Sequence, residues 1–172
     1  MPRLFFALWP DAAARESLGA LAKRVAEESG GRPVPAANLH LTLAFLGEVP
    51  AERVGELARI GGRIDSRPFR LAIDRTGGFP QARVAWAGPT EVPPPLAALQ
   101  ASLAQSLLAA GFAIEARPFA PHVTLARKVA RPPQSGEIGP VAWPVTGFSL
   151  VESARERGAY RDIGRWESGR EC

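Results

Sequence analysis

Cysteine, lysine, histidine and tyrosine are all scarce in this 172-residue chain. The one cysteine is the last residue, Cys172, so no disulfide can form within the chain, which fits a reducing compartment, and we expect a cytoplasmic protein. The apolar start of the chain is interrupted at Pro10 and Asp11, too early for a signal peptide. No stretch approaches the ~20 apolar residues that a membrane span needs, so we expect no membrane contact.

Basic residues are almost all arginine, because Lys23 and Lys128 are the only lysines among 21 basic side chains. The formal net charge is +4 and the pI about 10.2. A guanidinium group binds phosphate through two parallel hydrogen bonds, so this composition suits a protein that handles phosphates. With 46% hydrophobic and 22% charged residues, the chain is typical of one globular domain over residues 1–172. We expect it to be a monomer.

The only two histidines stand in the same five-residue pattern. Side chains alternate between the two faces of a strand, so His and Thr two residues apart point to one side while the apolar residues point into a core. If the two strands lie side by side, two imidazoles and two hydroxyls converge on one cleft. The two motifs are His40-Leu41-Thr42-Leu43-Ala44 and His122-Val123-Thr124-Leu125-Ala126.

Two imidazoles can divide the work of general acid–base catalysis. A neutral one takes a proton from an attacking water, and a charged one gives a proton to a leaving oxygen. Threonine hydroxyls can hydrogen-bond an anion held between them. Opening a cyclic phosphodiester requires these steps and needs no metal. A metal site is the weaker alternative, because two histidines are too few for zinc and nothing in the spacing of Asp74 or Glu48 adds a ligand. We expect no metal and no cofactor.

Hydrophobic periodicity predicts alternating strands and helices of an α/β protein. A helix begins at Asp11 and ends at Gly30 and Gly31, and another begins at Pro50. Since the motifs occupy both halves of the chain, we expect two similar lobes related by a pseudo-twofold axis. The predicted strands are 3–9, 39–46, 69–74, 83–87, 112–116, 122–127, 145–151 and 160–166, with a third helix over 96–110, turns at 77–80 and 155–158, and a mobile surface loop over 131–140.

The two motifs resemble the paired His-x-Thr-x signatures of the 2H phosphoesterase superfamily, most closely its RNA 2′,3′-cyclic phosphodiesterase branch, long labelled 2′-5′ RNA ligase. The resemblance includes RLFFAL at 3–8, NLHLTLAFLG at 38–47 and RPF at 117–119 before PHVTLAR at 121–127. It implies a bilobal α/β (α+β) fold, with two lobes of antiparallel sheet and outer helices around a central cleft. It also implies metal-independent hydrolysis of 2′,3′-cyclic phosphates, on RNA ends or nucleotides, to 2′-phosphates.

For that reaction we assign His40 as general acid to the 3′ oxygen and His122 as general base to water, although the symmetry of the motifs permits the reverse. We expect Thr42, Thr124 and Arg127 to hold the phosphate and its developing charge. The resemblance supports the role of Arg127, because the family motif carries arginine at that place.

Arg127 and Phe45 occupy matching positions, each five residues after its histidine. In a regular strand this odd offset points both side chains away from the face that carries the histidine. They can reach the cleft only if each strand ends, bulges or twists before them. If it reaches the cleft, Phe45 can stack on a nucleobase; otherwise it belongs to the core. Phe5 is expected in the core, and Tyr160 on a solvated hairpin, with a nucleic-acid rim as the alternative.

Other functions remain open from the sequence. The same fold could hydrolyse another cyclic nucleotide phosphate or join RNA ends 2′-5′ without ATP, since neither an adenylating lysine nor a glycine-rich nucleotide loop is present. A non-catalytic module that binds RNA ends is a third hypothesis. Two proton carriers and two hydroxyls argue against it, because binding alone does not need them.

Overall fold

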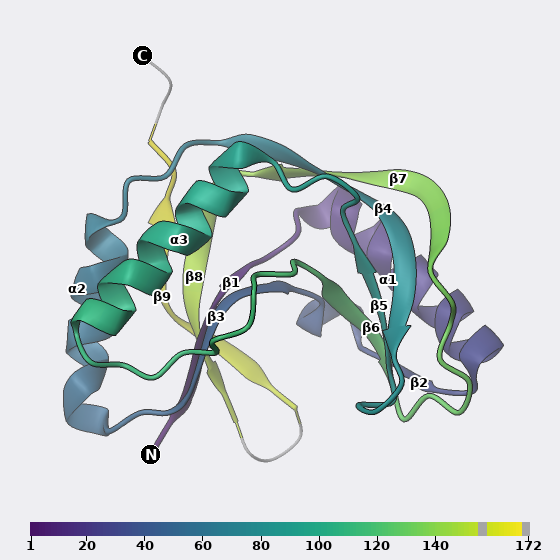
Figure 1. Ribbon diagram of the computed structural model, residues 1–172, viewed down its shortest axis with the longest axis horizontal. Helices are drawn as coiled ribbons and strands as arrows, with labels where there is room; N and C mark the ends of the chain where they lie inside the picture. Colours follow the sequence, from purple (N-terminus) through teal and green to yellow (C-terminus); the bar gives the residue numbers. More distant parts are fainter. Residues whose placement is uncertain (155–157, 170–172) are drawn as a thin grey trace.

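A computed structural model of the protein describes residues 1–154 and 158–169. Within these residues, three α-helices and two 3₁₀ turns accompany the strands (Figure 1). The helices are α1 (Ala12–Ser29), α2 (Val54–Arg63) and α3 (Pro94–Ala109), and the turns η1 (Ala36–Asn38) and η2 (Ala51–Arg53). The strands are β1 (Arg3–Leu8), β2 (Arg32–Pro33), β3 (Leu41–Glu48), β4 (Phe69–Phe79), β5 (Val84–Gly88), β6 (Val123–Arg127), β7 (Gly136–Val145), β8 (Gly147–Ser153) and β9 (Tyr160–Glu167).

All strands belong to one antiparallel sheet with the order β7-β4-β5-β6-β3-β1-β8-β9, and β2 adds to β6. The motif strands β3 and β6 meet in the middle through one registered pair, Leu41 opposite Val123. They divide the sheet into a first half (β3, β1, β8, β9) and a second half (β6, β5, β4, β7). The predicted mixed α and β class with two similar lobes is therefore confirmed.

Each half of the sheet carries a helix that the chain forms between strands of the other half. Helix α1 follows β1 but packs on β6, β7 and β5, whereas α3 follows β5 and packs on β3. Figure 1 shows α3 beside α2 on one flank of the molecule and α1 on the other. As predicted, Asp11 caps α1 by accepting a hydrogen bond from the Ala14 N–H at 2.9 Å, and Gly30 ends it with φ 70°.

The motif strands present their apolar residues to the core, as predicted. Leu41, Val123 and Leu125 are fully buried and Leu43 nearly so. They join one cluster with the inner faces of α1 and α3. Burial of a leucine side chain contributes about 1.5–3 kcal/mol, so these residues fix which face of each strand is left for the site. Among the described residues, no helix combines the length and the apolar character needed to cross a membrane.

The predicted surface loop over 131–140 is wrong for its second part. Residues from Gly136 onward form β7, which pairs with β4 along its length. Proline and glycine do not exclude a strand here, because β7 is an edge strand, where proline needs no partner for its missing N–H.

The strand predicted over 112–116 does not form. The chain there is held against the start of α2 instead, since the Arg53 guanidinium lies 3.9 Å over the Phe112 ring and donates a hydrogen bond to the Ala110 carbonyl at 2.7 Å. Phe112 is therefore buried against a side chain, although its segment pairs with no strand.

The predicted turn at Gly77 and Gly78 is displaced, because both glycines lie inside β4 and the turn follows over 80–83. A Cβ on Gly77 would clash with the Trp86 indole, including Cε2 at 2.8 Å. The glycine therefore makes room for a neighbouring ring rather than for a bend. The predicted turn over 155–158 lies mostly outside the described residues.

Candidate active site

The two His-Thr motifs converge on one pocket at the junction of the two halves of the sheet. Because Leu41 lies opposite Val123 in an antiparallel pair, the register places His40 across from Thr124 and Thr42 across from His122. All four side chains line a pocket of about 400 Å³. We call it the histidine pocket; its lining residues are Arg3, Phe5, His40, Thr42, Phe45, His122, Thr124, Arg127, Ser153 and Tyr160.

Both imidazoles are held in the same way. His40 Nδ1 lies 2.7 Å from the Asn38 carbonyl oxygen, and His122 Nδ1 lies 2.8 Å from the Ala120 carbonyl oxygen. A carbonyl can only accept, so Nδ1 carries the hydrogen in each ring. Nε2 is then left free to accept a proton when the ring is neutral or to donate one when it is charged. Either histidine can thus act as acid or as base from an orientation fixed by the backbone.

The surroundings of the two histidines differ. His40 contacts the rings of Phe5, Tyr160 and Trp9, with centroid distances of 4.9, 5.2 and 5.5 Å. Burial among these rings lowers the pKa of His40 below its ordinary value of 6.5; the Asn38 hydrogen bond opposes this shift, and the positive charges of Arg127 and His122 add to it. His122 contacts one ring, Phe79, at 5.2 Å. At neutral pH the free protein therefore holds His40 mostly uncharged.

A β-bulge in each motif strand brings Phe45 and Arg127 into the histidine pocket. Opposite β1, Thr42 pairs with Ala7 and Ala44 with Phe6, so Leu43 is an extra residue. Opposite β5, Thr124 pairs with Trp86 and Ala126 with Ala85, so Leu125 is the extra residue there. An extra residue reverses the alternation beyond it. The departure from regular strand geometry that the sequence required is therefore a bulge, at the same place in both motifs. The alternative prediction, which put Phe45 in the core, is wrong, because Phe45 is exposed and lines the pocket.

Residues near the start and end of the chain complete the pocket. Arg3 lies with Cζ 5.8 Å from the centre of the Phe45 ring, and Phe5 is buried against His40. Tyr160 packs edge-on against His40 rather than standing on a solvated hairpin. Alternation along β1 puts Arg3 and Phe5 on one face, which could have indicated both residues. Ser153 carries no comparable signal in the sequence.

Potential metal ligands do not gather at this site or elsewhere in the described part of the chain. Over residues 1–154 and 158–169, no group of three or more His, Cys, Asp or Glu side chains is placed to hold a metal ion. Asp74, considered from the sequence as a possible metal ligand, accepts hydrogen bonds from the backbone N–H and the hydroxyl of Thr90 at 2.7 and 2.9 Å.

The chemistry of the histidine pocket is that of an anion site between two proton carriers. Two hydroxyls and the Arg127 guanidinium can bind the non-bridging oxygens of a phosphate, and an imidazole stands on each motif strand beside it. This fold and this site define a two-histidine phosphoesterase.

The chain belongs to the LigT-like phosphoesterase family. The sequence model of that family matches twice, over residues 8–86 and over 87–160, and each match contains one His-Thr motif. The two matches agree with the repeated arrangement of the sheet.

Named relatives and solved structures agree with this membership. The chain is 38% identical to the RNA 2′,3′-cyclic phosphodiesterase of Escherichia coli K12 over 95% of each chain. It is 35% identical to the protein of that name in Thermus thermophilus, over 88% of this chain and 81% of the relative. The crystal structure of E. coli LigT complexed with 3′-AMP is similar with a TM-score of 0.88 and 37% identity, over 98% of this chain and 99% of that one.

Proposed function

We propose that the protein hydrolyses 2′,3′-cyclic phosphates, on RNA ends or on nucleotides, to 2′-phosphates. One observation carries the proposal: both imidazoles are fixed through Nδ1 to backbone carbonyls, which leaves two Nε2 atoms for one pocket that also holds two hydroxyls and Arg127. The names of the relatives supply the substrate class. Monomeric state, cytoplasmic location and a single domain over 1–172 stay predictions.

In the proposed reaction, Thr42, Thr124 and Arg127 hold the non-bridging phosphate oxygens and Phe45 offers a face to the base. Water attacks phosphorus in line with the bond to the 3′ oxygen, and His122 Nε2 takes the proton of that water. The bond from phosphorus to the 3′ oxygen breaks, and His40 Nε2 donates the proton that makes it a hydroxyl. The products are a 2′-phosphate and a free 3′-hydroxyl, with one proton taken and one given.

The lowered pKa of His40 sets a condition on this assignment. An uncharged His40 cannot act as an acid, so the substrate must favour its charged form. A phosphodiester in the pocket does this, because its negative charge beside the imidazole raises the pKa of His40. The proton donor is thus formed largely on binding.

The decisive experiment uses adenosine 2′,3′-cyclic phosphate with EDTA and metal-free protein, and it separates 2′-AMP from 3′-AMP. We expect 2′-AMP from the wild type, and rates about 10²–10⁴-fold lower from His40→Ala and from His122→Ala. The double variant should lose little more than the slower single variant, since the two groups act as a unit. Full activity of the double variant would refute the proposal, and 3′-AMP as product would overturn the choice of leaving oxygen.

Joining of RNA ends by a 2′-5′ linkage is the same displacement at phosphorus, with a 5′-hydroxyl in place of water and the 3′ oxygen again as the leaving group. No side chain of the histidine pocket favours it over hydrolysis. Supplying a 5′-hydroxyl oligonucleotide beside the cyclic phosphate measures it directly, as a 2′-5′-linked product formed without ATP.

A further inference from the structure

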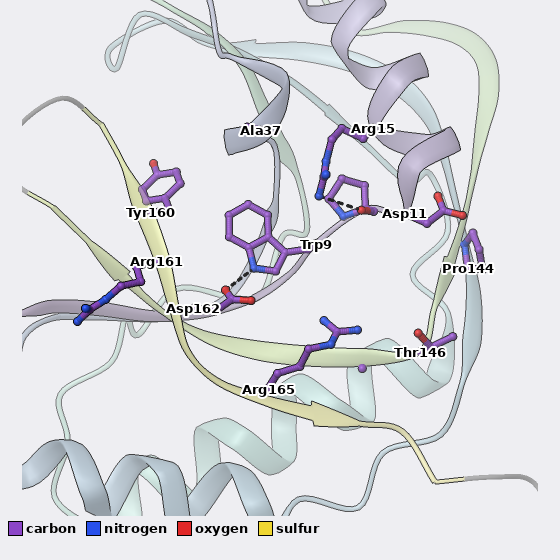
Figure 2. Close-up of a pocket in the computed structure, with 12 residues that line it drawn as sticks. Trp9, Asp11, Arg15, Ala37, Pro144, Thr146, Tyr160, Arg161, Asp162 and Arg165 are labelled. Carbon is purple, nitrogen blue, oxygen red and sulfur yellow. Dashed lines mark hydrogen bonds between the residues drawn. The ribbon is translucent and has the colours of Figure 1, made fainter.

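A second pocket lies on the other side of the aromatic residues that cover His40. It has a volume of about 620 Å³ and is formed by the connection from β1 to α1, the start of α1, η1, the junction of β7 and β8, and β9. We call it the Trp9 pocket, and Figure 2 shows its lining. Tyr160 lines both pockets. Trp9 lines the second pocket while its ring contacts His40 and Tyr160, with centroid distances of 5.5 and 6.2 Å.

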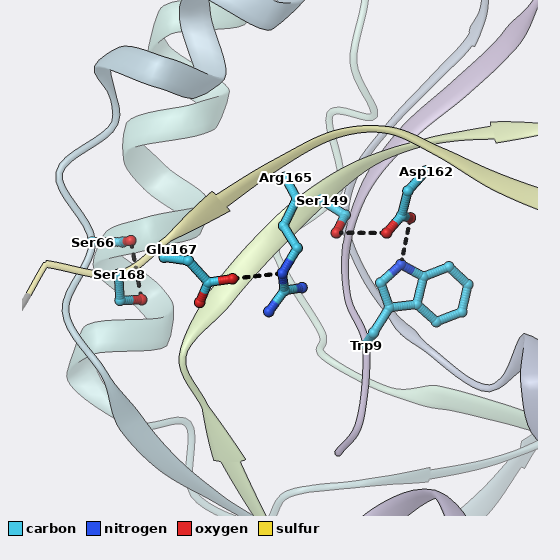
Figure 3. A network of polar contacts seen from close by, with 7 residues as sticks. All are labelled: Trp9, Ser66, Ser149, Asp162, Arg165, Glu167 and Ser168. Atoms are coloured by element: carbon cyan, nitrogen blue, oxygen red, sulfur yellow. Dashed lines mark hydrogen bonds and ion pairs between the residues drawn. The ribbon is translucent and has the colours of Figure 1, made fainter. Parts of the chain in front are cut away.

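Trp9 is fixed in place by a short chain of hydrogen bonds (Figure 3). Its indole Nε1 donates to Asp162 Oδ1 at 2.8 Å, and the hydroxyl of Ser149, which is fully buried, donates to Asp162 Oδ2 at 3.3 Å. The indole is therefore held rigidly between the two pockets. A rigid aromatic face is what a nucleobase stacks on, at little cost in conformational entropy.

The Trp9 pocket holds arginine side chains beside two carboxylates, and both carboxylates already accept hydrogen bonds from the protein. Asp162 already accepts from Trp9 and Ser149, and Asp11 caps α1. Arg165 uses its Nε on Glu167 Oε1 at 2.7 Å, which orients the guanidinium and leaves its terminal nitrogens. Figure 2 shows this guanidinium between Asp162 and Thr146. Arg165 thus faces the pocket with N–H groups suited to a phosphate.

We propose that the Trp9 pocket binds the nucleotide that precedes the terminal one in an RNA strand. The inference rests on the proposed function, because it places the terminal nucleotide in the histidine pocket. The chain of that nucleotide can leave only through its 5′ phosphate. On the far side of Tyr160, which lines both pockets, the Trp9 ring and the Arg165 guanidinium line one cavity. Proteins bind single strands by stacking on bases and by contacts to phosphates. The preferred substrate is therefore an RNA end rather than a mononucleotide.

The test compares kcat/KM for adenosine 2′,3′-cyclic phosphate with kcat/KM for a tetraadenylate that ends in the same group. The wild type should favour the tetranucleotide by about tenfold or more. Arg165→Ala should remove most of that ratio. Arg59→Ala is the matched control, since it deletes the same charge from an exposed position on α2 that lines neither pocket, and it should keep the ratio.

Salt gives a second readout. Each phosphate contact on a single strand adds about 0.7 to the slope of log affinity against log salt. Arg165→Ala should lower that slope by about this amount for the tetranucleotide, and Arg59→Ala should not. A wild type that hydrolyses both substrates equally well, or an Arg165→Ala protein that keeps the full ratio, overturns the inference.

Failure of the proposed function is distinguishable from failure of this pocket. If neither substrate is hydrolysed, the enzymatic proposal fails, and binding of a 5′-fluorescein tetraadenylate with a terminal 2′-phosphate still tests the pocket by anisotropy. Binding about tenfold weaker in Arg165→Ala than in Arg59→Ala supports it, whereas equal binding by the two variants refutes it.

Discussion

Replacing His40 by alanine should cost most at low pH, and this pH dependence tests its role as the acid. The variant loses about 10²–10⁴ in rate where His40 is charged in the wild type. Because burial lowers the pKa of His40 below 6.5, the free protein loses that charge as pH rises through a value lower than usual. The ratio of wild-type to variant kcat/KM should therefore fall about tenfold per pH unit above that pKa.

The assay measures kcat/KM for adenosine 2′,3′-cyclic phosphate from about pH 5 to 8, because this constant reports protonation of the free protein. The wild-type profile alone cannot separate the two assignments, since both need one proton on the pair. Dividing by the His40→Ala profile removes the contribution of His122. A ratio that rises with pH to a plateau would make His40 the base and refute the assignment.

A substrate with sulfur in place of the leaving oxygen gives an independent check. A thiol has a pKa of about 8.5, so it leaves as a thiolate without a proton donor. His40→Ala should then act on the sulfur substrate within a few-fold of the wild type, while His122→Ala stays slow. The opposite pattern would exchange the two roles.

Two further results are expected. In an NMR titration His40 should have a midpoint below 6.5 in the free protein, and inorganic phosphate should raise it; a midpoint at or above 6.5 without phosphate would contradict the effect of burial. Gly77→Ala should lower the free energy of unfolding by about 1–3 kcal/mol, because its new Cβ meets the Trp86 ring. Gly55→Ala, on α2 with nothing within 4 Å, should instead raise it by about 0.5–1 kcal/mol. Thermal unfolding measures both, and equal shifts would show that the ring contact has no effect.

The His-Thr pairing could be predicted from the sequence because it depends only on local alternation and on a repeated motif. The sequence could name the two faces open to Phe45 and Arg127 but could not choose between them, since a bulge depends on the partner strand. Leu43 and Leu125 give no local sign that they are extra residues. The register opposite β1 and β5 shows it at once.

Long-range pairing explains what the sequence could not predict. The β7 strand contains prolines that favour a loop when it is considered alone, and it becomes a strand because β4 offers an edge. The two-residue strand β2 is too short to produce a periodic pattern. The Trp9 pocket unites the connection from β1 to α1 with β9, from opposite ends of the chain, so only the fold brings Trp9 and Arg165 together.

The path of the chain through the sheet makes the two repeats inseparable. Residues 8–86 supply β3 to one half and β4 to the other, and residues 87–160 supply β6 and β8 in the same crossed manner. Each repeat thus contributes strands to both halves of the sheet, as in a domain-swapped dimer whose two subunits are joined into one polypeptide. A chain severed between the repeats would hold one histidine on each fragment. Turnover of a cyclic phosphate on mixing the two fragments would then show that they had associated into the complete site.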